Sequence, residues 1–194
     1  MSGTSQTFTI LGIPGSLRKG SFNRGLLRAA QQVAPDGVEI EIYDIGEIPL
    51  YNGDVEAQGI PSPIHDFAEK IRAADALLIS TPEYNYSIPG VLKNAIDWVS
   101  RPSVGNPLKH KPIALTGASG GMFGTARSQL AMRQVLASMI DAHTMIKPEL
   151  LVTEAGKKFD EQGNLTDDDI RKRLGELIDA LVAWTRRLET NNPA

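Results

Sequence analysis

Apolar runs rich in β-branched residues recur along the chain and alternate with segments of helical spacing. Because strands that alternate with helices pair in parallel, this order predicts an α/β domain on a parallel sheet. The runs at 76–81 and 112–117 are almost continuously apolar, as in strands covered on both faces, whereas 38–44 alternates as a strand near an edge does. The five expected strands are 8–13, 38–44, 76–81, 112–117 and 145–152.

Between these runs, apolar residues fall three and four positions apart, which indicates amphipathic helices. One helix is expected after Asn23, another after Pro89, and the last opens with Thr166 as N-cap, followed by three aspartates. Five strands and about five helices on both faces favour a flavodoxin-like, doubly wound sheet of order 2-1-3-4-5. The whole chain, 1–194, is expected to form this single domain, with 51–63 as a turn-rich loop.

The composition limits the chemistry. The 194 residues are 41% hydrophobic and 22% charged, as in a soluble globular protein, and the formal net charge of -3 argues against nucleic-acid binding. The chain has no cysteine, which excludes disulfides, thiolate nucleophiles and cysteine-ligated metals, so redox chemistry must come from a cofactor. We see no signal segment and no membrane-spanning run, and we expect a cytoplasmic protein.

In a doubly wound sheet, ligands bind at the carboxyl ends of the strands near the switch point, so the loops after strands one, three and four matter most. The first of these loops, "GIPGSLRKGSFNRGLL", offers an anion the N-terminus of a helix together with Ser16, Arg18, Ser21 and Asn23. It lacks the lysine of a Walker loop, where Ser21 stands instead, and the G-x-G-x-x-G of a dinucleotide site. A single phosphate is therefore favoured, with a capped turn facing solvent as the alternative.

The loop after strand three, "TPEYNYSIPGVLKNAIDW", holds two prolines that restrict its backbone, together with acceptor, donor and aromatic side chains. These are the groups that the edge and faces of a flavin ring require. The alternative is that the tyrosines only pack and the glutamate caps a helix. The residues concerned are Pro82, Glu83, Tyr84, Asn85 and Tyr86.

The loop after strand four, "TGASGGMFGTARSQL", is rich in glycine, which permits close approach of the backbone to a ligand. Gly117, Ser119, Gly120 and Gly121 are placed to line the same planar group. The alternative is a flexible connection to the next helix.

Together the three loops resemble the flavodoxin-like NAD(P)H-dependent FMN reductases, which include quinone and chromate reductases of bacteria. "GSLRKGSFN" resembles their phosphate loop and "PEYNYSIPGVLKNAIDW" their isoalloxazine loop, and the resemblance spans Phe8 to Pro148. It implies that the FMN phosphate and ribityl end contact Ser16, Arg18, Ser21, Phe22 and Asn23. It also implies that the flavin ring contacts Pro82, Glu83, Tyr84, Asn85 and Tyr86, with Ser119, Gly120 and Gly121 from the third loop.

The resemblance further implies ping-pong hydride transfer from NADPH or NADH through FMN to a small acceptor such as a quinone or chromate. The cofactor carries this chemistry, so no catalytic side chain is assigned, and amides of the strand-four loop are expected to stabilise charge on the reduced ring. An anionic acceptor needs a nearby cation, and Arg101 is the candidate. The alternative is that Arg101 is a solvated charge at a helix end and binds no ligand.

Family members form dimers and tetramers, so a homodimer or homotetramer is expected. Arg127 and Glu149 match positions that resemble an interface ion pair of tetrameric relatives, whereas Leu130 stands where those relatives often have a tyrosine. The three histidines share no metal-ligand spacing, so no metal site is expected. The rival functions are a flavodoxin-type electron carrier, which is usually more acidic, and a receiver domain, whose aspartate cluster is missing after strand one.

Overall fold

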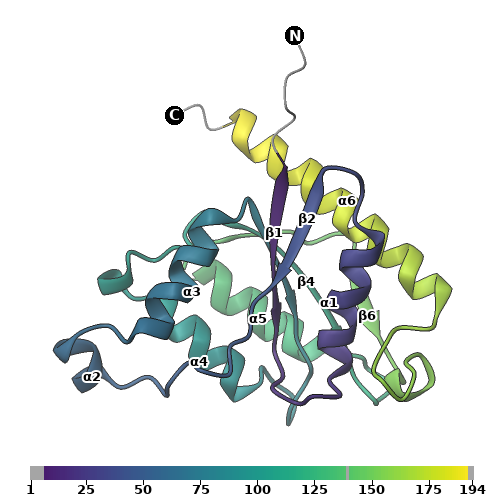
Figure 1. Cartoon of the computed structure of the whole chain (residues 1–194), viewed down its shortest axis with the longest axis horizontal. Helices are drawn as coiled ribbons and strands as arrows, with labels where there is room; N and C mark the ends of the chain where they lie inside the picture. Colours follow the sequence, from purple (N-terminus) through teal and green to yellow (C-terminus); the bar gives the residue numbers. More distant parts are fainter. Residues whose placement is uncertain (1–6, 139, 192–194) are drawn as a thin grey trace.

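The computed structural model describes residues 7–138 and 140–191. Its parallel strands lie in the order β2-β1-β3-β4-β5, with β6 also paired to β4, and helices cover both faces (Figure 1). The flavodoxin-like order expected from the sequence is therefore confirmed. The strands are β1 (Phe8–Pro14), β2 (Val38–Ile42), β3 (Ala76–Ser80), β4 (Pro112–Ala118), β5 (His143–Thr144) and β6 (Leu150–Val152).

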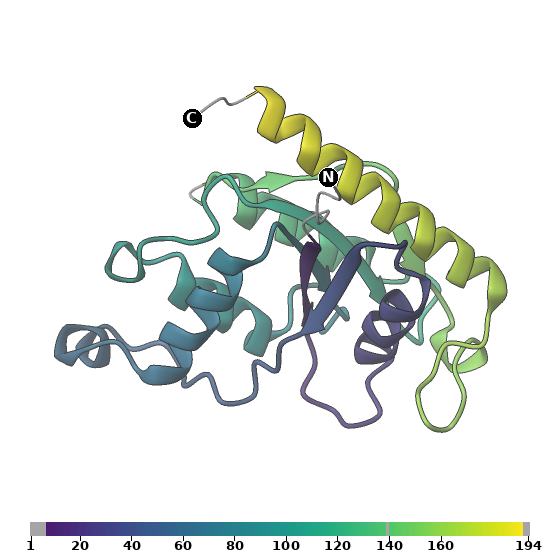
Figure 2. The same ribbon diagram turned by 45° about the horizontal axis from the view of Figure 1, so that its top comes forward.

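The helices divide into two layers, and each layer encloses a separate apolar core. In Figures 1 and 2, α1 and the long α6 lie together on one side of the sheet, with α3, α4 and α5 on the other. Their bounds are α1 (Phe22–Val33), α2 (Gly53–Gln58), α3 (Ser62–Ala73), α4 (Gly90–Val99), α5 (Ala126–Ser138) and α6 (Asp168–Asn191), and two short 3-10 turns are η1 (Pro102–Val104) and η2 (Ala155–Lys157).

The apolar faces expected for the helices are buried as the spacing indicates. Leu26, Leu27 and Ala30 of α1 have no exposed surface, and Leu92 and Ile96 of α4 have none either. These residues pack on strands that are themselves fully buried, β3 above all. The helices thus shield both faces of the sheet from water. The part of the sheet that they leave uncovered is the edge where the strands end.

Three local expectations are wrong. The expected fifth strand, 145–152, is a strand only at β6, whereas β5 lies before that range, and Pro148 between the two has no N–H to donate to a ladder. The turn-rich loop 51–63 contains α2, whose first turn is capped by Asn52 Oδ1, which accepts a hydrogen bond from Asp54 N at 2.8 Å. Helix α6 is capped by Asp167 rather than Thr166, since Asp167 Oδ1 accepts from Ile170 N at 3.0 Å.

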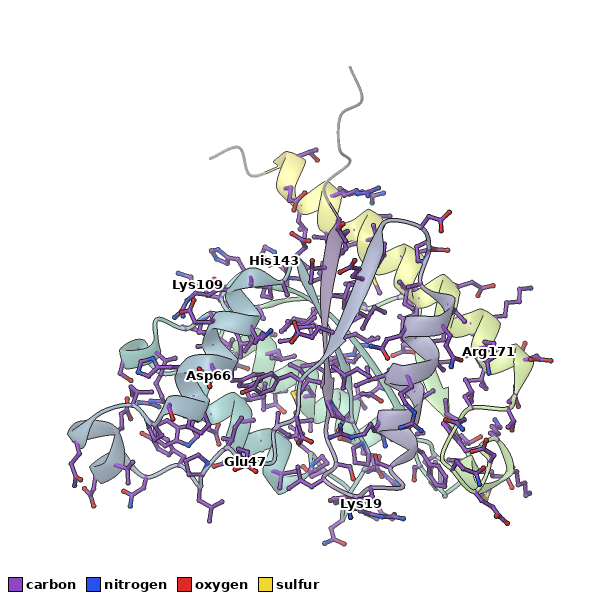
Figure 3. All side chains as sticks on the ribbon, in the orientation of Figure 1. Lys19, Glu47, Asp66, Lys109, His143 and Arg171 are labelled. Atoms are coloured by element: carbon purple, nitrogen blue, oxygen red, sulfur yellow. The ribbon has the colours of Figure 1, made fainter. Side chains whose placement is uncertain are left out.

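The register brings the carboxyl ends of β1, β3 and β4 to one edge of the sheet. Pro14 pairs with Ser80, and Ser80 pairs with Thr116 two residues before β4 ends. The three loops selected in the sequence therefore start side by side. Lys19, in the first of them, lies at the lower end of the molecule in Figure 3, whereas His143 of β5 lies toward the upper end.

Candidate functional site

A cavity of about 300 Å³ lies where the three loops meet. It falls at the lower end of the size range of small-molecule sites, and it is open on one side. Ten of the thirteen residues expected at the cofactor line it, together with Ala118, which was not expected there. The lining residues are Ser16, Arg18, Ser21, Phe22, Asn23, Pro82, Glu83, Tyr84, Ala118, Ser119 and Gly120.

The loop after β1 presents an uncompensated positive charge beside the N-terminus of α1. Ser21 caps the helix, its Oγ accepting a hydrogen bond from Arg24 N at 3.3 Å. Arg18 and Lys19 are exposed, and neither forms an ion pair within the part of the chain that the structure describes. Free helix N–H groups, hydroxyls and a guanidinium together favour an anion here.

Asn23 joins the first loop to the fourth strand. Its Nδ2 donates to Ala118 O at 2.9 Å, and its Oδ1 accepts from Ala118 N at 2.9 Å and from Ser80 Oγ at 3.0 Å. Because Asn23 and Ser80 are buried, water does not compete for these bonds. The amide side chain is thus occupied by the protein itself and fixes the start of α1 against the ends of β3 and β4.

A tight turn carries the aromatic residues of the second loop. Tyr84 N donates to Ser87 O, and Ser87 N donates to Tyr84 O, at 3.1 and 3.0 Å. The two central residues, Asn85 and Tyr86, have φ of 47° and 69°, the left-handed conformation that such a turn demands. The Tyr84 hydroxyl lies 3.1 Å from Ser16 Oγ, so this turn is also tied to the first loop.

Glu83 joins the second loop to the third. Its carboxylate accepts from Arg127 N at 3.0 Å and Ser128 N at 3.3 Å, at the start of α5, and forms an ion pair with the Arg127 guanidinium. Hydrogen bonding to Glu83 raises the pKa of Arg127. Glu83 was expected at the flavin ring, and its pairing with Arg127 was not expected. Glu83 lines the cavity, and its contact with a flavin stays a prediction.

The glycine-rich loop after β4 has open space at Gly120, which lines the cavity, and a tightly packed position at Gly117. A Cβ added to Gly120 would meet no heavy atom within 4 Å, whereas one added to Gly117 would lie 2.1 Å from Thr81 O. Ser119 Oγ accepts from Gly121 N at 3.2 Å, and Glu154 N donates to Gly121 O at 3.1 Å. Gly117 is therefore required by packing, and Gly120 keeps its backbone open to a ligand.

Arg101 does not line this cavity. It follows α4, whose first residue adjoins the second loop, and ten residues at about 1.5 Å each place the far end ~15 Å away. Its Nε lies 3.7 Å from Glu56 Oε2, and the guanidinium lies 5.5 Å from the Tyr51 ring centroid. Hydrogen bonds from Ser103 and Tyr51 lower the pKa of Glu56. The substrate role of Arg101 stays a prediction.

The expected interface residues have partners within the chain. Arg127 is held by Glu83, and Glu149 accepts from Lys147 Nζ at 2.9 Å. Leu130 is 65% exposed on α5. The expected dimer or tetramer is not tested by these contacts and stays a prediction.

Other features of the surface carry none of the expected residues. A cavity of about 480 Å³ lies between β5 and α6, lined by 144–147 together with Ala180, Ala183, Trp184 and Arg187. Among residues 7–138 and 140–191, no three histidine, aspartate or glutamate side chains converge as metal ligands would.

Within the same residues, no helix combines the length and apolar character needed to cross a membrane.

Known proteins resemble the chain over nearly its full length. The family model described as NADPH-dependent FMN reductase matches residues 8–157. An NAD(P)H-dependent FMN reductase of Pseudomonas aeruginosa is 52% identical, with 95% of this chain and 98% of the relative covered. An NAD(P)H:quinone oxidoreductase of Solanum tuberosum is 45% identical, with 93% and 94% covered. The solved structure of the flavoenzyme FerB, an NAD(P)H:(acceptor) oxidoreductase from Paracoccus denitrificans, is similar with a TM-score of 0.83, 36% identity, and coverage of 93% and 98%.

Proposed function

Because the chain belongs to the NADPH-dependent FMN reductase family, we propose that it is an FMN-dependent oxidoreductase that moves electrons from NADPH or NADH to quinones. The observation that carries this proposal is the cavity at which a cationic helix start, a stiff aromatic turn and a glycine loop converge. These are the groups that a phosphate and a flat heterocycle require.

The residues present fit FMN. The phosphate would be held by Ser16, Ser21, Arg18 and the first N–H groups of α1, since the Arg18 guanidinium is exposed and has no acidic partner among the described residues. Pro82, Tyr84 and the turn at 84–87 would contact the ring, and the open backbone at Gly120 would allow it to lie close to the loop. Asn23 would act through Ala118 by setting the position of the strand-four loop.

The protein's part in the reaction is to bind and orient. Bound FMN supplies two-electron chemistry in which NAD(P)H, a proton and a quinone give NAD(P)⁺ and a hydroquinone, the nicotinamide leaving before the acceptor enters. In the loop at 119–121, Ser119 N donates to Val152 O and Gly121 N to Ser119 Oγ, so the N–H of Gly120 is the group we expect to stabilise negative charge near the ring. No side-chain acid or base is assigned.

The kinetic order tests this reaction. Initial rates measured with varied NADPH at several fixed quinone concentrations should give parallel double-reciprocal lines, as expected when donor and acceptor use one site in turn. Lines that intersect would show that both molecules bind together and would contradict the shared site.

Substituting Gly120 by Val tests the placement of the cofactor. The added side chain meets open space in the protein, so the melting temperature of the apoprotein should not change, but Gly120 lines the cavity and a bulky residue there should crowd a bound ring. We expect the Kd for FMN, measured by flavin fluorescence, to rise about tenfold, which corresponds to ~1.4 kcal/mol. Gly156→Val is the control, because its Cβ also meets nothing within 4 Å but lies outside the cavity. An unchanged Kd in the Gly120 variant would place the ring elsewhere.

Chromate reduction is a further activity that we propose, with Arg101 as the cation for anionic acceptors. The Arg101 side chain is 43% exposed, and its Nε lies 3.7 Å from Glu56 Oε2, a long distance for an ion pair. Arg101→Ala should retain FMN and raise the KM for chromate or NADPH several-fold, because an exposed charge contributes about 1 kcal/mol or less. Steady-state constants measured for both substrates check this, and constants equal to those of the wild type would remove Arg101 from the site.

A further inference from the structure

We propose that the cavity of about 480 Å³ between β5 and α6 binds a flat aromatic carboxylate. This space, which we term the α6 cavity, shares no lining residue with the cavity at the three loops. His143 of β5 lies toward the upper end of the molecule in Figure 3, whereas Lys19 of the first loop lies at the lower end. The α6 cavity is therefore a second site, separate from the proposed cofactor site.

Small residues on one face of α6 leave the space open. The helix contributes Ala180, Ala183, Trp184 and Arg187, which follow the spacing of a single helix face. The two alanines carry only a methyl group, whereas Leu181, on the adjacent face, fills the core. The resulting volume lies within the range of small-molecule sites. This face of α6 thus leaves room for a ligand beside the end of β5.

Trp184 provides the α6 cavity with an aromatic wall. It is half-buried and packs against the apolar core. Its ring centroid lies 6.5 Å from that of His143 at an interplanar angle of 62°, an edge contact that restrains the indole. Ile146, which is 67% exposed, adds apolar surface on the side of β5. A restrained ring with apolar neighbours stacks flat molecules with little loss of conformational entropy.

The charged residues of the α6 cavity are both positive. They are Lys147 and Arg187, and among the described residues no carboxylate lines the space. Acidic residues outnumber basic ones in this chain, 23 to 20, so its composition does not predict such a wall. The Lys147 side chain pairs with Glu149 at 2.9 Å but is 74% exposed, and such pairs are weak. Arg187 forms no ion pair within 7–138 and 140–191.

The two walls together define the ligand. A compact anion such as phosphate would meet the cations and leave Trp184 and Ile146 uncovered. An uncharged ring would cover the apolar wall and leave the cations unused. A ring that carries a carboxylate uses both walls, because a carboxylate accepts charge-assisted hydrogen bonds from arginine and lysine.

Calorimetric titration with 2-naphthoate tests this assignment, with uncharged 2-naphthamide as the matched probe. The protein is saturated with FMN, so that the cavity at the three loops is filled. We expect one site for 2-naphthoate with a Kd of about 100 μM, as is typical of a ligand of this size. The Kd for 2-naphthamide should be about fivefold higher, because an exposed charge contributes about 1 kcal/mol or less.

Three variants locate the probe. Arg187→Gln should raise the Kd for 2-naphthoate about fivefold and leave that for 2-naphthamide unchanged. Arg186→Gln is the matched control, because Arg186 is the neighbouring exposed arginine of α6 and does not line the cavity. Ala183→Leu fills the space from an exposed position and should raise both Kd values at least about tenfold.

Each other outcome overturns the proposal in its own way. A titration that does not saturate excludes the site, and equal affinities for the two probes exclude an anion site. Equal weakening by Arg186→Gln and Arg187→Gln assigns the effect to the general charge of α6. Undiminished binding in a folded Ala183→Leu variant places the probe elsewhere. The arginine variants change only exposed side chains, so they decide the question even if the leucine variant does not fold.

Discussion

Substituting Asn23 by Ala is expected to lower both the stability of the protein and its affinity for FMN. The change leaves the N–H and C=O of Ala118 and the hydroxyl of Ser80 without their buried partner. Each unsatisfied buried group costs about 1–3 kcal/mol, so the three groups together should cost about 3 kcal/mol or more. Because Ala118 lines the cavity, the Kd for FMN should rise at least about tenfold.

Gln31→Ala is the matched control for Asn23→Ala. Gln31 lies on the same helix, and its Nε2 donates one hydrogen bond to the backbone, to Ile40 O at 2.8 Å, away from the cavity. Thermal unfolding and flavin fluorescence should show a small loss of stability and no change in FMN affinity. If both variants weaken FMN equally, Asn23 stabilises the helix only and does not position the site.

Substituting Gly117 by Ala should cause a loss of stability as large as that of Asn23→Ala. The new Cβ would lie 2.1 Å from Thr81 O and 2.3 Å from Thr125 Oγ1, and both residues are fully buried. The Thr81 backbone cannot withdraw easily, because Thr81 N donates to Thr116 O at 2.9 Å. Overpacking at such a site costs about 3 kcal/mol, and at ~2–4 °C per kcal/mol the melting temperature should fall by about 6–12 °C.

The control for Gly117→Ala is Gly156→Ala, whose Cβ meets nothing within 4 Å and should leave the melting temperature within about 1 °C. The Gly117 variant should also bind FMN less tightly, because Thr81, which the new Cβ would displace, directly precedes Pro82 and Glu83 in the second loop. A Gly117 variant as stable as the control would show that β4 and the second loop are not in close contact.

Much of the fold was predictable because its signals are local. Buried parallel strands are continuous in apolar residues, as 76–80 shows, and the helices carry one apolar face each. The family was also predictable from two long motifs, and the match over residues 8–157 confirms it. The bounds of the last two strands were not predicted, because the apolar pattern of 145–152 says nothing of which residues pair with a neighbouring strand.

The sequence predicted where the site residues lie better than it predicted what each side chain contacts. Residues at the ends of β1, β3 and β4 were expected to converge, and ten of them share one cavity. The pairing of Asn23 with Ala118, and of Glu83 with Arg127, joins residues 95 and 44 positions apart. Sequence patterns do not report such distant pairs. The sequence position of Ala118 does indicate its place at the site, because it directly precedes Ser119 at the end of a strand that terminates there.

The most direct test of the reductase is an absorbance spectrum recorded under nitrogen. The protein is incubated with FMN, gel-filtered, and then given NADPH or NADH, followed by a quinone. We predict a retained yellow chromophore that bleaches with one or both nicotinamides and recovers when quinone is added. A protein that retains no flavin after gel filtration would contradict the FMN site, and a retained flavin that neither nicotinamide bleaches would contradict the reductase.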